Sequence, residues 1–163
     1  YKRQVTIPEE AFIVERQTRR QEFRTFVPRV IEPSFGVDRI LASVLEHSLT
    51  YDEAEDYTRL TLPARLAPIK VAVLPLSKKP DLVETTQKVA GLLRDRWQIE
   101  VDITQSIGRR YRRQDEIGTP FCVTVDFDSL EDGQVTVRDR DTMAQDRIPI
   151  ENVPAYLADR LPN

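Results

Sequence analysis

The sequence predicts an α/β fold, with a mixed and largely parallel sheet flanked by helices. Two observations carry this prediction. From residue 70 onwards, short apolar runs alternate with segments of helical periodicity in the order βαβαββα, which is typical of strands joined by crossover helices. Residues 1–30, in contrast, are polar and lack a clean apolar face of their own, so we expect them to belong with a larger sheet and not with this α/β domain.

The predicted hairpin lies near the start of the chain. Phe12–Val14 and Phe26–Val27 are short apolar runs bounded by polar residues, which indicates two strand pieces. Arg19–Glu22 is the predicted tip between them. Because the pair has no apolar face, we expect it to belong to a larger sheet whose other strands lie outside this sequence.

A helix is predicted from Val37 to Ser48, where apolar side chains recur at helical spacing along one stripe. Ser34 or Asp38 is placed to cap its start. The acidic segment after the helix reads as exposed, and Pro63 and Pro68 then bracket a short linker. We therefore expect two parts, residues 1–62 and residues 63–163.

The second part carries the predicted α/β elements. Pro75 closes a buried strand, Asp81-x-x-Glu84 resembles a capping box, and a turn at Glu131–Gly133 joins the last two strands. The predicted strands are Val71–Leu74, Ile99–Ile103, Phe121–Phe127 and Gln134–Asp139, and the predicted helices are Asp81–Trp97, Gly108–Ile117 and Pro149–Leu161.

The composition of the chain limits the compartments and the binding partners that we expect for it. The net charge of -3 gives no global sign of a nucleic-acid partner, so such a contact needs a local basic patch. Cys122 is the one cysteine, which makes an internal disulfide impossible and favours a reducing, cytoplasmic location. No apolar run approaches the roughly 20 residues of a membrane span. The sequence begins with Tyr1 rather than Met, so we expect a fragment whose upstream part, with any targeting peptide, is not visible.

The richest stretch is residues 31–39, which reads Ile-Glu-Pro-Ser-Phe-Gly-Val-Asp-Arg. Glu32 is suited to an ammonium group, and Ser34 places a small hydroxyl beside it. Gly36 allows a backbone to approach a ligand closely, and Arg39 supplies a planar cation suited to a phosphate or a purine. Considered one by one, Glu32 and Arg39 also fit a surface ion pair, and Gly36 also fits a turn.

A second stretch, residues 106–121, places Arg109, Arg110, Tyr111, Arg112 and Arg113 in succession and follows them with two acids. Such a run is often a solvated helix face. Its arginines are equally suited to phosphates and unpaired bases, and its acids to cytosine amino groups.

The remaining polar features predict less. A third stretch, residues 137–143, alternates Arg and Asp and fits either a braced sheet edge or a nucleic-acid contact. His47 has no partner at metal-ligand spacing, Cys122 sits between apolar residues as a small buried side chain, and we expect no metal site.

Together these strings resemble class II glycyl-tRNA synthetases of the dimeric archaeal and eukaryotic type, over residues 26–161. Residues 31–39 resemble the third class II motif, and residues 62–75 resemble the link to the anticodon-binding domain. The resemblance implies that residues 1–62 are the end of an antiparallel catalytic domain, consisting of a β-hairpin and a helix, and that residues 63–163 bind the anticodon. It assigns Arg39 to ATP as the catalytic cation, and Glu32, Ser34, Gly36 and Arg39 to substrate binding. The expected anticodon-binding residues are Arg110, Arg113, Asp115 and Glu116.

The resemblance implies ATP-dependent attachment of glycine to its tRNA through glycyl-adenylate, with Mg²⁺ accompanying ATP, in a homodimer. The first two class II motifs do not occur here, so we expect the isolated chain to be inactive without an N-terminal catalytic part. The alternative is a non-catalytic nucleic-acid or protein-binding module, as in polymerase accessory subunits. The intact string from Glu32 to Arg39 favours the enzyme.

Overall fold

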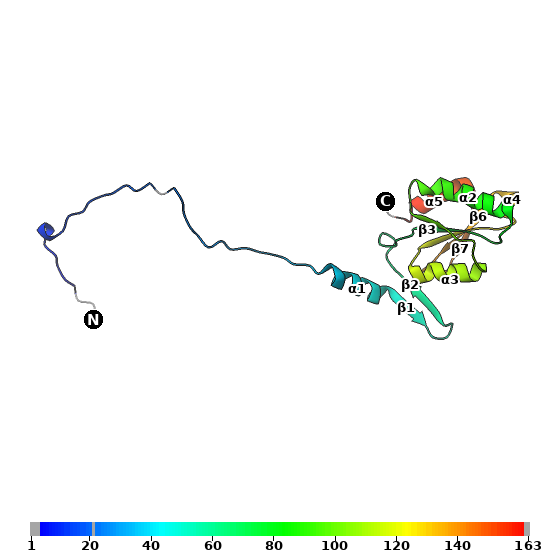
Figure 1. Ribbon diagram of the computed structural model, residues 1–163, viewed down its shortest axis with the longest axis horizontal. Helices are drawn as coiled ribbons and strands as arrows, with labels where there is room; N and C mark the ends of the chain where they lie inside the picture. The colour runs from blue at the N-terminus through cyan, green and yellow to red at the C-terminus, as the bar shows by residue number, and fades with distance from the viewer. Residues whose placement is uncertain (1–3, 21, 162–163) are drawn as a thin grey trace. The chain divides into compact units, whose positions relative to one another are not determined.

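The computed structural model describes residues 4–20 and 22–161, and the chain divides into two units, residues 1–34 and residues 35–163. The first unit is extended apart from a 3-10 turn, η1 (Glu9–Ala11), drawn in blue in Figure 1. All of its described residues are exposed, with Ile13 95% and Val27 94% accessible.

The hairpin predicted for this first unit is wrong, because none of its described residues lies in a strand. Phe12–Val14 and Phe26–Val27 have β-forming side chains, but no strand pairs with them among the described residues of this unit, and a lone two-stranded hairpin is marginal in water. Arg19, Arg20 and Glu22 of the predicted tip are extended or bent, and Gln21 lies outside the described residues.

The second unit contains the α/β domain. Its sheet has five strands in the order β4-β3-β5-β6-β7. The strands are β3 (Val71–Pro75), β4 (Ile99–Val101), β5 (Phe121–Val125), β6 (Gln134–Asp139) and β7 (Gln145–Pro149). β4, β3 and β5 run parallel, whereas β6 and β7 are antiparallel to their neighbours. The prediction of a mixed, largely parallel sheet is confirmed.

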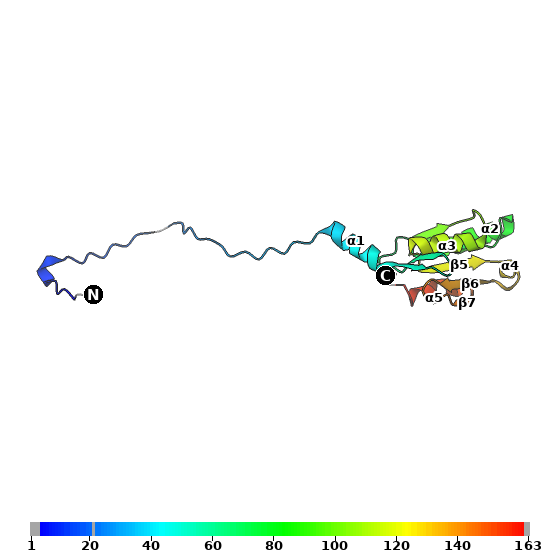
Figure 2. The same ribbon diagram turned by 90° about the horizontal axis from the view of Figure 1, so that it is seen from below.

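Helices cover both faces of this sheet. The helices are α2 (Pro80–Arg94), α3 (Ile107–Ile117), the short α4 (Ser129–Asp132) and α5 (Val153–Ala158), the last preceded by a 3-10 turn, η2 (Ile150–Asn152). In Figure 1, α2 and α5 lie above the sheet and α3 lies below it. Figure 2 shows α5 on the side that carries β6 and β7.

Strand alternation divides the buried side chains between these two layers. Val71 and Val73 point into the main core with side chains of α2 and α5. Ala72, Leu74 and Cys122 face the opposite way and pack against α3. The surface beneath α3 is therefore small and apolar, and α3 can sit close to the sheet.

Helix α1 (Val37–Ser48) has the predicted bounds, but neither predicted cap forms. Gly36 occupies the N-cap position, and no side chain makes a capping hydrogen bond there. The apolar stripe of α1 is largely exposed, with Val37 75% and Leu41 56% accessible. Within the second unit, α1 therefore leaves an apolar face without a partner.

A two-stranded hairpin follows α1, where the sequence suggested only an exposed acidic segment. It consists of β1 (Leu49–Asp52) and β2 (Tyr57–Leu60), and β2 packs against α3. The Asp52 carboxylate fixes the turn by accepting hydrogen bonds from the backbone N–H groups of Ala54, at 3.0 Å, and Glu55, at 3.4 Å. The acidic residues thus form the turn between two strands that carry Tyr and Thr.

Other boundaries also differ from prediction. Helix α2 begins at Pro80 with Lys79 as its N-cap, so the expected Asp81–Glu84 capping box does not form. The predicted C-terminal helix is divided between η2 and α5, and strand β7 was not predicted because its charged residues hide the alternation. None of the helices in the described part of the chain is long and apolar enough to cross a membrane.

Candidate functional site

Helix α3 positions the arginine-rich stretch over the sheet. Ile107 and Tyr111 pack on the small apolar surface of β3 and β5, which fixes the rotation of the helix. The helix ends at Gly118, whose φ of 85° lies in the left-handed region that favours glycine. Tyr111 and Thr124 of β5 share a hydrogen bond between their hydroxyl groups. This anchoring determines which charged side chains of α3 face inwards.

Arg110 faces inwards and is 1% exposed. Its Nε donates to the Thr104 carbonyl at 3.0 Å, its Nη2 donates to the Gln105 carbonyl at 2.8 Å, and its Nη1 donates to the Pro75 carbonyl. The guanidinium therefore joins the end of β3 to the loop that precedes α3. In this arrangement the side chain serves the fold, because its donors are occupied by backbone carbonyls.

Asp115 is fully buried and lies at the centre of a polar cluster. Its carboxylate accepts hydrogen bonds from Arg138 at 3.0 and 2.8 Å and from the Tyr57 hydroxyl. Burial and the hydrogen bond to Asp115 raise the pKa of Tyr57 to about 12, so this hydroxyl remains a donor at neutral pH. Burial alone would lower the pKa of Arg138, but its bonds to Asp115 raise that pKa above its ordinary value.

The outward surface of α3 carries Arg109, Arg112, Arg113 and Glu116, which we call the α3 face. With Gln105 these residues line a shallow depression of about 230 Å³. Arg113 already has acceptors within the protein, since its Nη2 donates to Asp102 and, at 2.9 Å, to the Thr104 hydroxyl. Arg112 lies over the Tyr57 ring with 5.3 Å between the guanidinium carbon and the ring centre.

The structure thus separates the four residues expected at the anticodon. Arg113 and Glu116 lie on the α3 face, whereas Arg110 and Asp115 are buried. Sequence reasoning missed Arg109 and Arg112 as members of the same face. The spacing contained this information, because the face follows the i, i+3, i+4, i+7 pattern of one helical stripe.

A second cavity lies beside this face, between the hairpin β1–β2 and the turn that joins β6 to β7. We call it the hairpin pocket. It has a volume of about 360 Å³ and is lined by Asp52, Glu55, Tyr57, Arg59, Arg138 and Met143. Sequence reasoning did not find it, because its residues come from two segments some eighty positions apart.

The alternating Arg and Asp residues at the end of β6 and directly after it brace the fold. Arg138 holds Asp115, and Arg140, which is 3% exposed, donates to the carbonyls of Gly118 at 2.7 Å and Leu62 at 2.9 Å. Asp139 accepts hydrogen bonds from the N–H groups that begin the following turn. Of the two interpretations left open by the sequence, these contacts match the brace.

The stretch from residue 31 to residue 39 crosses the boundary between the two units. Glu32 and Ser34 belong to the first unit, and both are exposed. Gly36 and Arg39 belong to the second, where both are also exposed. A Cβ added at Gly36 would meet only the Arg39 side chain, at 3.9 Å, so packing within the unit does not require glycine at this position.

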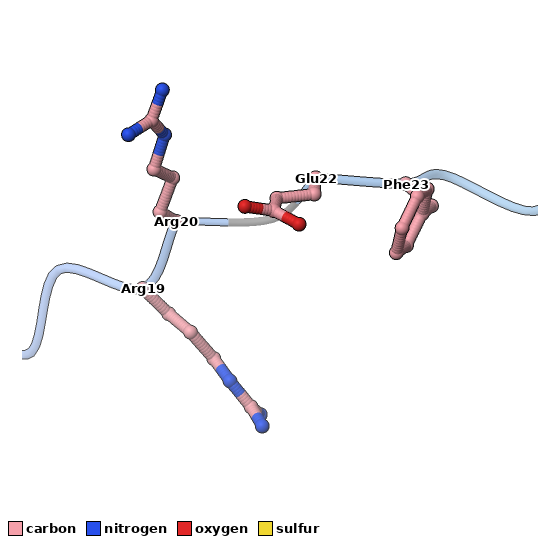
Figure 3. Close-up of a pocket in the computed structure, with 4 residues that line it drawn as sticks. All are labelled: Arg19, Arg20, Glu22 and Phe23. Carbon is pink, nitrogen blue, oxygen red and sulfur yellow. The ribbon is translucent and has the colours of Figure 1, made fainter.

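Two further features of the described residues do not form reactive sites. In the first unit, Arg19, Arg20, Glu22 and Phe23 line an open depression, but Figure 3 shows Arg19 and Arg20 pointing to opposite sides of the chain. In the second unit, burial raises the pKa of the Cys122 thiol to about 12, which keeps it protonated. Its predicted role as a small buried side chain is confirmed.

Comparisons with known proteins match these features. The family described as "Anticodon binding domain" matches residues 70–160. "Glycine--tRNA ligase" of Thermobifida fusca is 56% identical over 149 residues, covering 86% of this chain and 32% of that protein. The protein of the same name from Corynebacterium efficiens is 53% identical over 143 residues, covering 83% of this chain and 31% of that one. The chain therefore spans about a third of the length of the curated relatives it matches.

A solved structure agrees on the fold. The RNA binding domain of threonyl-tRNA synthetase from Cryptosporidium parvum superposes with a TM-score of 0.56 and 22% identity, covering 62% of this chain and 26% of that one. The family match extends from the residue before β3 to the residues after α5, which is the whole five-stranded sheet and its helices. The chain belongs to the anticodon-binding domain family.

Proposed function

We propose that this chain is the C-terminal part of a glycine–tRNA ligase and that residues 63–163 bind the anticodon of the tRNA for glycine. The observation that carries the proposal is the 56% identity to a protein of that name over 86% of the chain. The similarity also includes residues outside the anticodon-binding region, since the alignment of 149 residues is longer than residues 70–160. The rival, a binding module without catalysis, leaves that additional similarity unexplained.

The α3 face supplies the local basic patch that an acidic chain requires for RNA. We assign the phosphate contacts to Arg109, Arg112 and Arg113, with Glu116 beside them as an acceptor for a base amino group. Arg110 and Asp115 support this face from the interior, because both are buried and hydrogen-bonded. This assignment refines the expectation that all four predicted residues lie at the anticodon.

Residues 1–62 belong, in this proposal, to the end of the catalytic domain. Glu32 and Ser34 would line the pocket for glycine, Gly36 would let the backbone approach the substrate, and Arg39 would hold ATP during formation of glycyl-adenylate. The exposed apolar stripe of α1 supports this division, since such a face is suited to packing against a larger domain. Mg²⁺ would arrive with the ATP phosphates, and we assign it no ligand from this chain. The whole enzyme would be a cytoplasmic homodimer.

A chimeric enzyme tests the proposal. The N-terminal two thirds of the Thermobifida fusca protein is joined to this chain, and glycylation of the tRNA for glycine is measured. We expect activity from the chimera and none from either part alone, including no glycine-dependent pyrophosphate exchange by this chain. An Arg39→Gln chimera should lose about 100-fold or more in exchange, since removal of one preorganised donor costs about 2.7–4 kcal/mol. A folded chimera that binds tRNA but does not glycylate it would contradict the proposal.

A further inference from the structure

Arg140 joins four segments of the second unit that lie far apart in the sequence. Its Nη2 donates to the Leu62 carbonyl at 2.9 Å, and its Nη1 donates to the Gly118 carbonyl at 2.7 Å. Its own backbone carbonyl accepts from Nη1 of Arg59 at 3.3 Å, and its backbone N–H donates to the Pro120 carbonyl at 3.0 Å. One residue therefore holds the segment after the hairpin, the strand β2, the end of α3 and the residue before β5.

The Arg140 guanidinium is fixed by burial and by charge. Arg140 is 3% exposed, and Leu62, whose carbonyl it binds, is 5% exposed. Asp141 pairs with the guanidinium at 2.8 and 3.0 Å and supplies its counter-charge. Helix α3 carries no basic residue in its last turn, so the Arg140 cation also complements the negative end of that helix dipole.

The contacts continue from Leu62 to the end of α1. Thr61 donates from its backbone N–H to the Ser48 carbonyl at 2.7 Å and from its hydroxyl to the same oxygen at 2.9 Å. Ser48 is the last residue of α1 and is buried. A continuous line of covalent neighbours and hydrogen bonds therefore runs from α1 through residues 61 and 62 and Arg140 to the end of α3. We call this line the Arg140 clamp.

Close packing of the hairpin on α3 supports the same rigid arrangement. A Cβ added at Gly118 would lie 3.1 Å from the Leu60 carbonyl oxygen and 3.2 Å from the Leu62 side chain. The end of the hairpin and the end of α3 therefore meet at the residues that Arg140 binds. These contacts bridge across the linker between Pro63 and Pro68, so that linker does not free α1 from α3 within the second unit.

Such a connection matters for an enzyme that holds its tRNA at two places. When the anticodon is bound, the stiffness of the connection determines how often the far end of the tRNA meets the reacting groups. We propose that Arg140 is a positioning residue for glycylation, which joins α1, the hairpin β1–β2 and α3 into one body and so holds the bound tRNA at a fixed distance from the catalytic part. The inference rests on the proposed function, in which the α3 face binds the anticodon and Arg39, in the first turn of α1, binds ATP.

The chimeric enzyme provides the test, because it contains both sites. Transfer of glycine from preformed glycyl-adenylate to tRNA is measured in a single turnover, alongside the affinity for the anticodon stem–loop and glycine-dependent pyrophosphate exchange. We expect Arg140→Met, which removes both donors without burying a new charge, to slow the transfer about tenfold or more, because small misplacements of reacting groups have effects of this size. Stem–loop affinity and pyrophosphate exchange should remain those of the unmodified chimera.

Two further variants make the test specific to the clamp. Thr61→Val removes only the hydroxyl contact to Ser48, and we expect it to slow the transfer by a smaller factor. Arg147→Met removes a guanidinium of the same size from ion pairs with Asp126 and Asp132, outside the clamp, and should leave the transfer rate unchanged. Thermal unfolding shows which variants are folded, and Thr61→Val decides the question if Arg140→Met does not fold.

The outcomes separate this inference from the proposed function. Transfer at the unmodified rate by folded Arg140→Met and Thr61→Val chimeras would overturn the positioning role. Equal slowing by Arg147→Met, or losses in stem–loop affinity or exchange as large as the loss in transfer, would also overturn it, because a residue that only stabilises the fold gives those results. An unmodified chimera that binds tRNA but does not glycylate it would instead overturn the proposed function.

Discussion

The Asp115 carboxylate receives both Nη1 and Nη2 of Arg138, at 3.0 and 2.8 Å, in the interior between α3 and β6. The same carboxylate accepts from Tyr57, so the contact joins the hairpin β1–β2 to the α/β domain. Both members of the pair are buried, at 0% and 6% exposure. The cluster fixes the helix that presents the α3 face and one wall of the hairpin pocket.

Removal of either charge of the Asp115–Arg138 pair should therefore lower the stability of the fold. Asp115→Asn leaves the Arg138 charge buried without a counter-ion, and we expect the free energy of unfolding to fall by about 3–5 kcal/mol. Urea denaturation at neutral pH measures this. The double variant Asp115→Leu with Arg138→Met removes both charges and should be less destabilised than Asp115→Asn. A double variant that loses as much stability as Asp115→Leu and Arg138→Met lose separately, added together, would show that the pair is not coupled.

Gly118 should be more sensitive to substitution than Gly133. Both have positive φ, at 85° and 66°, so alanine incurs a backbone cost of roughly 1 kcal/mol at each. At Gly118 the new Cβ would also lie 3.1 Å from the Leu60 carbonyl oxygen, whereas at Gly133 no atom lies within 4 Å. We expect Gly118→Ala to lower the free energy of unfolding more than Gly133→Ala does. Equal decreases in the free energy of unfolding would mean that the hairpin β1–β2 moves away from the new Cβ without cost.

Stability should depend on Asp126 at low pH. Its hydrogen bond to Arg147 lowers the pKa of Asp126 from 3.8 to about 2. A lowered folded-state pKa stabilises the fold above pH 4, and this contribution is lost as the pH falls towards 2. The pair is partly exposed, so we expect Asp126→Asn to cost only about 1 kcal/mol at pH 5 and a small part of that near pH 2, where the folded-state carboxyl is about half protonated. Urea titrations of Asp126→Asn and of the unmodified chain at several pH values measure this difference.

Binding of single-stranded RNA should depend on salt through the α3 face. Each phosphate contact contributes about -0.7 to the slope of log affinity against log salt concentration. Arg109→Gln should therefore make the slope shallower by about 0.7. Lys88→Gln, an exposed change on α2 across the sheet, should leave the slope as it was. A shallower slope for Lys88→Gln, with no change for Arg109→Gln, would place the RNA on the α2 side.

The sequence predicted those elements whose signals are local. The stripe of α1 and the alternation of β6 are contained within single segments, and their bounds Val37–Ser48 and Gln134–Asp139 agree with the structure. The hairpin β1–β2 was missed because five residues of its turn region are acidic or small and hide the flanking β-formers. The strands predicted in the first unit failed for the opposite reason, since their residues favour β-structure but no partner strand lies in the described part of that unit.

The candidate site shows the same limit. The run of arginines on α3 indicated a charged helix, but composition does not distinguish Arg110, which bonds inwards, from Arg109, which is exposed. Helical phase resolves part of this difference. The rest depends on Arg138, which lies 23 positions after Asp115 and meets it only through the fold. The hairpin pocket depends on the same kind of long-range contact.

The central claim, that this chain binds the anticodon of the tRNA for glycine, is tested most directly by one ratio of affinities. The dissociation constant of the chain is measured for the anticodon stem–loop of that tRNA and for the same stem–loop with both anticodon cytosines replaced by uridines, at one fixed salt concentration. The account predicts at least about tenfold tighter binding of the cytosine loop, because each specific base contact contributes about 1–3 kcal/mol. Equal affinity for the two RNAs would contradict it.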